Sequence, residues 1–196
     1  MSFVNLNTKE IHCKIVYYGP SLSGKTTNMQ WIYQEIQGKN KSELFTLPTS
    51  TERTLFFDFL PIEIGTIRGY KLRLHLYTVP GQVVYEASRR LILKGLDGVI
   101  FVADSQAERM EENMASMQSL QKNLAQQGVD IRKVPMVIQY NKRDLPTAED
   151  LRELKLKLNK YGCPDFEAQA HIGVGVFESL KTVSKSIIAS LKSGRI

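Results

Sequence analysis

Two hydrophobic patterns alternate along this chain of 196 residues. Short apolar runs bounded by polar or glycine-containing segments predict strands, and longer stretches with apolar residues three and four positions apart predict helices. The predicted strands cover residues 11–18, 55–60, 71–77, 97–103 and 134–140, with a shorter one near 165–170. The predicted helices cover about 25–36, 110–124, 148–160 and 175–192.

The second and third of these strands form a predicted hairpin. Residues 71–77 alternate strictly between polar and apolar, which indicates a strand with one exposed face. A turn around Gly65 and Gly69 connects them to residues 55–60. Two strands joined by a short turn pair most simply in antiparallel fashion.

The remaining strands indicate a parallel sheet. Residues 97–103 and 134–140 carry continuous apolar runs, as strands covered on both faces do. Residues 37–53 are polar, rich in Lys, Ser and Thr, and without a clear period, so we expect a long loop there. We therefore predict an α/β three-layer sandwich with a mostly parallel six-stranded sheet and one antiparallel strand, in a single domain over residues 1–196.

Composition narrows the function classes. No run approaches the roughly 20 apolar residues of a membrane span, and neither end carries a readable signal peptide or lipidation motif. Cys13 and Cys163 are far apart and do not have the spacing of metal ligands. We therefore expect two reduced thiols, as in a cytoplasmic protein. The net charge is +6, but without a run of basic residues or an RNA-binding aromatic signature we expect no nucleic-acid partner. The expectation is a cytoplasmic protein without a lipid anchor.

A phosphate-binding motif follows the first predicted strand. Residues 19–26 satisfy G-x-x-x-x-G-K-[ST], in which glycines let backbone N–H groups converge on phosphate oxygens at the start of a helix. Lys25 would neutralise the β- and γ-phosphates, and the Thr26 hydroxyl would ligate Mg²⁺. The expected nucleotide contacts are Gly19, Ser21, Leu22, Ser23, Gly24, Lys25, Thr26 and Thr27.

A second motif identifies the base. Asn141, Lys142 and Asp144 follow an apolar strand in the pattern Asn-Lys-x-Asp. A carboxylate there accepts hydrogen bonds from the guanine N1–H and exocyclic amine, which adenine does not offer, and the lysine stem covers the purine face. The expected cofactors are therefore GTP or GDP with Mg²⁺.

With both motifs in place, the chain resembles the Ras-like small GTPases, and most closely the bacterial MglA family that controls gliding motility and cell polarity. The resemblance covers almost the full length and implies the Ras-like P-loop fold. Gln169-Ala170-His171 stands where the family's Ser-Ala-Lys contacts the base, so the Ala170 N–H is a candidate donor to the guanine oxygen. The other matched strings are 14–20, 53–61, 75–82, 101–105 and 139–146.

The metal site departs from the Ras-like pattern. Thr78 stands where the family's Asp-x-x-Gly-Gln begins with an acid. Asp58, a carboxylate in an otherwise apolar strand, is a candidate replacement because a buried charge needs a partner. A structural salt bridge from Asp58 to Arg73 on the neighbouring strand is the alternative.

The resemblance also implies the catalytic residues. Gly81 would donate its N–H to the γ-phosphate, Gln82 would orient the attacking water, and Arg53 resembles an internally supplied arginine finger. Thr54 would contact Mg²⁺ or the γ-phosphate in the active state. Spacing alone leaves Thr49 and Thr51 as alternatives to Thr54.

The expected function is a GTP-hydrolysing switch that is slow without an activating partner. Residues 37–60 and 79–90 would be the switches, and the second strand would shift register between nucleotide states. The resemblance implies a roadblock-type homodimeric activating protein and polarity or motility effectors, with the chain itself monomeric and concentrated at a cell pole. A GTP-dependent scaffold without turnover and a P-loop kinase are the alternatives; the absence of an arginine-rich lid weighs against the kinase.

Overall fold

The computed structural model describes residues 3–36, 45–46, 58–80 and 86–193. Its strands are β1 (Phe3–Asn5), β2 (Glu10–Tyr18), β3 (Phe45–Thr46), β4 (Asp58–Ile67), β5 (Tyr70–Thr78), β6 (Gly98–Asp104), β7 (Met136–Asn141) and β8 (Asp165–Glu167). Its α-helices are α1 (Lys25–Ile36), α2 (Glu86–Leu93), α3 (Met110–Ala125), α4 (Leu151–Leu158) and α5 (Val176–Lys192). Short 3-10 turns are η2 (Ala107–Arg109), η3 (Ile131–Lys133) and η4 (Ala170–Ile172).

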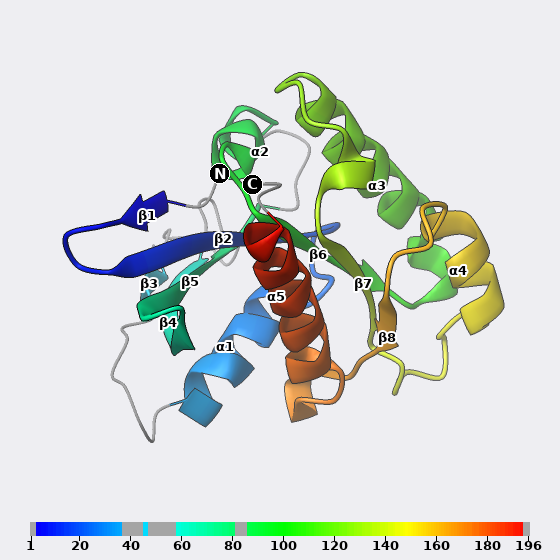
Figure 1. Cartoon of the computed structure of the whole chain (residues 1–196). Coiled ribbons are helices and arrows are strands. Elements are labelled where there is room, and N and C mark those ends of the chain that lie inside the picture. Colours follow the sequence, from blue (N-terminus) through cyan, green and yellow to red (C-terminus); the bar gives the residue numbers. More distant parts are fainter. Residues whose placement is uncertain (1–2, 37–44, 47–57, 81–85, 194–196) are drawn as a thin grey trace.

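The strands form one twisted sheet in the order β3-β4-β5-β2-β6-β7-β8 (Figure 1). The predicted six-stranded, mostly parallel sheet is confirmed as β2 and β4 to β8, with β4 antiparallel to β5. The short strands β1 and β3 each add an antiparallel pairing to it. The fold is that of a Ras-like P-loop protein.

The hairpin turn lies at the second of the two glycines around which it is predicted, and not at the first. Strand β4 continues through Gly65, where a register shift after Glu63 marks a bulge. The chain reverses at Arg68 and Gly69, whose φ angles are 50° and 82°. Two consecutive positive φ angles give the tight turn whose twist matches the strands that it joins. This position fixes which residues of β4 and β5 share a face.

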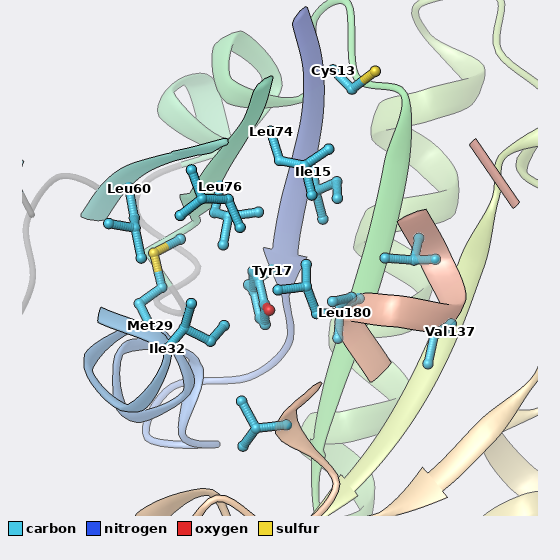
Figure 2. Packing of buried hydrophobic residues seen from close by; sticks show 14 of the residues in the cluster. Cys13, Ile15, Tyr17, Met29, Ile32, Leu60, Leu74, Leu76, Val137 and Leu180 are labelled. Carbon is cyan, nitrogen blue, oxygen red and sulfur yellow. The ribbon is translucent and has the colours of Figure 1, made fainter. Parts of the chain in front are cut away.

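Helices cover both faces of the sheet. One core joins β2, β4, β5, β6 and β7 to α1 and α5 and includes Tyr17, Met29 and Leu180 (Figure 2). The other joins β6 and β7 to α2, α3 and α4. The methionines of α3 belong to that second core, so they pack against the sheet. No helix in the described part of the chain has the length and apolarity to cross a membrane.

Candidate nucleotide-binding site

The phosphate loop runs from the end of β2 to the start of α1. Gly19 and Gly24 have φ angles of 148° and 99°, a region in which side chains are strained. A Cβ at Gly19 would overlap the Val102 carbonyl oxygen, and one at Gly24 would overlap the Asn141 amide. The loop therefore requires both glycines, because neighbouring residues leave no space for a side chain at either position.

Lys25 lies inside this loop. Its ammonium donates to the carbonyl oxygens of Gly19 (3.1 Å) and Pro20 (2.5 Å), and the residue is only 7% exposed. Burial lowers the pKa of Lys25 to about 7; the Asp58 charge opposes this shift and the Arg89 charge adds to it. A phosphate within reach would favour the charged form.

Asp58 lies at the start of β4, with its carboxylate between two hydroxyls. Its Oδ2 accepts from Thr26 Oγ1 at 2.7 Å and from Thr78 Oγ1 at 2.9 Å. The Asp58 N–H donates to the same Thr78 oxygen at 2.8 Å. Asp58 is 1% exposed, and its Oδ1 has no hydrogen-bond partner among the residues that the structure describes. Asp58 Oδ1 is thus a buried carboxylate oxygen without a partner among the described residues, and the Asp58 carboxylate lies beside the Thr26 hydroxyl of the phosphate loop.

The alternative partner for Asp58 is wrong. Arg73 pairs with Glu10 at 2.9 Å and more loosely with Glu63 at 3.9 Å. Side chains alternate along a strand, so Thr78 and Arg73 point to opposite faces of β5. Of these two residues, Thr78 and not Arg73 lies on the face of Asp58.

A pocket of about 230 Å³ lies beside the phosphate loop. It brings together residues from several segments, including the base motif and the segment matched to Ser-Ala-Lys. Its lining is Leu22, Gly24, Thr27, Asn141, Lys142, Asp144, Leu145, Ala170 and His171. The sequence motifs therefore converge, although more than a hundred residues separate the first from the second.

Asn141 ties three of these segments together. Its Nδ2 donates to Ser23 O at 2.8 Å, and its Oδ1 accepts from the Ala170 N–H at 2.9 Å. The Ala170 N–H therefore already has an acceptor, and its contact with guanine stays a prediction. Asp144 lines the same pocket.

Asp104, at the end of β6, is a site residue that sequence reasoning missed. Lys142, with a φ angle of 66°, donates from Nζ to Asp104 Oδ2 at 2.6 Å. The Asp104 side chain is 1% exposed. The available signal was a carboxylate ending a wholly apolar strand, which predicts a cationic partner.

Four predicted residues lie outside the described part of the chain. They are Arg53, Thr54, Gly81 and Gln82, and the alternatives Thr49 and Thr51 lie outside it as well. Their roles in the metal shell and in hydrolysis stay predictions.

Comparison with known proteins agrees with this geometry. The profile of the ADP-ribosylation factor family matches residues 1–187. The mutual gliding-motility protein MglA of Myxococcus xanthus (strain DK1622) is 59% identical over 194 residues, which cover 99% of this chain and 100% of that protein. The chain therefore belongs to the Ras-like small GTPases of the MglA family, and it is a guanine-nucleotide-binding GTPase.

Proposed function

We propose that this chain is a Mg²⁺-dependent GTP switch that controls gliding motility and cell polarity. The motility role rests on the name of the Myxococcus relative. The proposed Mg²⁺ dependence rests on the Asp58 carboxylate, which accepts hydrogen bonds from two threonine hydroxyls beside the phosphate loop. On this proposal Asp58 supplies the charge that Thr78 lacks.

The residues present fit a magnesium ion. Mg²⁺ in phosphoryl-transfer sites is bound by one or two protein groups together with substrate phosphates. Thr26 and Asp58 are such groups, and Asp58 Oδ1 is available for the metal or its water among the described residues. When bound, Mg²⁺ neutralises charge that develops on the β- and γ-phosphates. Thr54 is the third proposed ligand, from outside the described residues.

The pocket beside the loop is the proposed guanine site. Asp144 accepts from the base, Lys142 covers its face, and Asn141 holds the surrounding segments in place. Ala170 lines the same pocket and is the proposed donor to the guanine oxygen, which requires its N–H to be shared with Asn141. The phosphates lie against the backbone of residues 19–27 and the Lys25 ammonium.

Hydrolysis on this proposal is mainly positioning. Phosphoryl transfer leaves little covalent work for the protein, so Gln82 orients water, Gly81 contacts the γ-phosphate and Arg53 stabilises developing charge. A roadblock-type homodimeric partner would align Arg53 and Gln82 by docking on residues 37–60 and 79–90. The free chain is a monomer in this proposal, concentrated at a cell pole with its effectors.

Single-turnover phosphate release tests the proposal. We expect the chain alone to release phosphate from GTP slowly, and a roadblock-type partner to accelerate this release. Arg53→Ala or Gln82→Ala should abolish the acceleration while GTP stays bound. GTP, and not ATP, should displace a fluorescent guanine nucleotide. Binding without any release, with or without the partner, would instead support the scaffold; displacement by ATP would support a kinase.

A further inference from the structure

One buried carboxylate lies between the base motif and the phosphate loop. Asp104 ends β6, next to Asn141 in the sheet register. Its backbone is fixed by Asn113 of α3, which accepts from the Asp104 N–H at 2.9 Å and donates to the Asp104 carbonyl at 2.7 Å. The backbone from which the Asp104 carboxylate projects is therefore held in place by α3.

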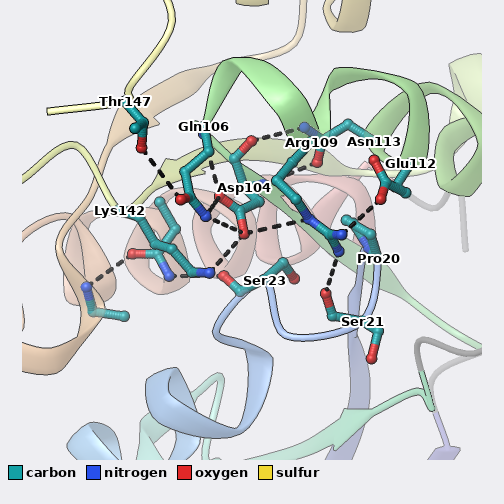
Figure 3. Close-up of polar contacts among 12 residues, drawn as sticks. Pro20, Ser21, Ser23, Asp104, Gln106, Arg109, Glu112, Asn113, Lys142 and Thr147 are labelled. Atoms are coloured by element: carbon teal, nitrogen blue, oxygen red, sulfur yellow. Dashed lines mark hydrogen bonds and ion pairs between the residues drawn. The ribbon is translucent and has the colours of Figure 1, made fainter. Parts of the chain in front are cut away.

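Cationic and amide groups converge on this carboxylate (Figure 3). Lys142 Nζ donates to Oδ2 at 2.6 Å, and Arg109 Nε lies 3.9 Å from the same oxygen. Gln106 donates to Oδ1 through its backbone N–H and its Nε2, both at 3.2 Å. Gln106 Oε1 also accepts from Thr147 Oγ1 at 3.2 Å, and Thr147 follows the base motif in the chain.

Arg109 extends this cluster to the phosphate loop. Its Nη2 donates to the Ser21 carbonyl at 3.1 Å, and its Nη1 pairs with Glu112 at 2.6 Å. Ser21 lies in the middle of the loop and Arg109 lies at the start of α3. The Arg109 guanidinium thus connects the Asp104 carboxylate with the backbone of the phosphate loop.

We propose that Asp104 and Arg109 form a nucleotide-retention clamp, in which Asp104 orients Lys142 at the base and Arg109 holds the phosphate loop at Ser21. Both are positioning residues, because they act through Lys142 and Ser21 and need not contact the nucleotide. The inference rests on the assignment of these two loops to guanine nucleotide in the proposed function. It predicts that the two loops hold or release the nucleotide together.

The clamp should set the release rate and not the capture rate. Lys142 and Ser21 belong to loops that would contact GDP and GTP alike. Retention of both nucleotides should therefore fall together when the clamp is loosened. A folded but loosened site still captures nucleotide at a rate limited by encounter, and most affinity changes at one site appear in dissociation.

The experiment measures dissociation of a fluorescent GDP from the loaded protein. Arg109→Gln should accelerate release about tenfold, which corresponds to about 1.4 kcal/mol, with the association rate unchanged. Glu112→Gln removes only the exposed ion pair of Arg109 and should release GDP at the wild-type rate. Arg132→Gln is a matched control, because Arg132 forms an exposed pair with Asp130 at 2.8 Å on η3.

A double-mutant cycle tests whether the two residues act as one unit. Asp104→Asn keeps the shape of the side chain, and its effect on release should combine with that of Arg109→Gln to less than the product. The clamp is wrong if Arg109→Gln leaves GDP release unchanged while Lys142→Ala accelerates it. Unchanged release in Lys142→Ala as well would instead overturn the site assignment beneath it.

Discussion

The hydroxyl of Thr78 and the carboxylate of Asp58 are hydrogen-bonded across two antiparallel strands. Thr78 Oγ1 donates to Asp58 Oδ2 at 2.9 Å and accepts from the Asp58 N–H at 2.8 Å. Both residues are 1% exposed. On the proposed function, the acid that Ras-like proteins carry at position 78 is supplied by the neighbouring strand, and the threonine holds it.

Restoring an acid at position 78 should therefore impair the site. In Thr78→Asp two buried carboxylates would stand side by side, and like charges in a buried site repel. We expect a weaker response of GDP release to Mg²⁺ than in the wild type. The double variant Asp58→Asn/Thr78→Asp again has one carboxylate and should recover part of the wild-type response of GDP release to Mg²⁺. A stronger Mg²⁺ response in Thr78→Asp alone would contradict this account.

Asp144 is expected to select the base. Asp144→Asn replaces an acceptor of two hydrogen bonds by an amide, which suits a carbonyl at that edge of the purine. GTP affinity should fall by about a hundredfold or more, because a charged hydrogen-bonded group is lost at a specificity site. Xanthosine triphosphate affinity should rise. Competition against a fluorescent guanine nucleotide measures both, and unchanged GTP affinity would remove Asp144 from the site.

Gly24 is expected to be irreplaceable for packing reasons. A Cβ there would overlap the Asn141 amide and break its bonds to Ser23 and Ala170. Gly24→Ala should lower the free energy of unfolding by about 2–3 kcal/mol. Gly128 is a matched control, since its φ angle is 72° and a Cβ would meet nothing within 4 Å. Gly128→Ala should cost only about 1 kcal/mol. Equal losses in urea unfolding would refute the packing argument.

A pair of histidines predicts how stability depends on pH. His75 Nε2 lies 2.7 Å from His12 Nδ1, so one ring donates and the other accepts. Burial lowers the pKa of His75, and the His12 and Arg73 charges lower it further; only the Glu10 charge opposes them.

Because the fold favours neutral His75, the unfolded chain binds more protons below about pH 6.5, the ordinary pKa of a histidine. The stabilising contribution of His75 is therefore present above that pH and lost as pH falls. Urea unfolding of the wild type between about pH 7.5 and pH 5 should show this loss, and His75→Gln should show less of it. His171 is exposed, so His171→Gln should keep the wild-type slope. A His75→Gln profile parallel to the wild type would exclude His75 as the cause.

Local motifs were predictable because their chemistry is contiguous in the chain. The phosphate loop needs Gly19, Gly24 and Lys25 at fixed spacing between a strand and a helix, and each is where the motif requires. The base motif was predictable for the same reason: its residues are contiguous and follow a strand with a strong apolar run.

The partner of Asp58 was not predictable, because it depends on strand register. A turn placed between Gly65 and Gly69 leaves the pairing of the hairpin undetermined, and a slip of one residue exchanges its two faces. The turn at Arg68 and Gly69 places Thr78, and not Arg73, beside Asp58. The Asp104 cluster was missed because Lys142 reaches it from the segment that follows another strand, β7, and no spacing in the sequence reports that contact.

The Mg²⁺ dependence of GDP release tests the central claim, that Asp58 completes the metal site. Asp58→Asn keeps an oxygen to accept from Thr26 and Thr78 while removing the charge, so the fold should persist. In the wild type, millimolar Mg²⁺ should slow release by about tenfold or more relative to a chelator, equal to about 1.4 kcal/mol. In Asp58→Asn, release should be nearly insensitive to Mg²⁺ and close to the wild-type rate in chelator. A wild-type Mg²⁺ response in Asp58→Asn would contradict the account.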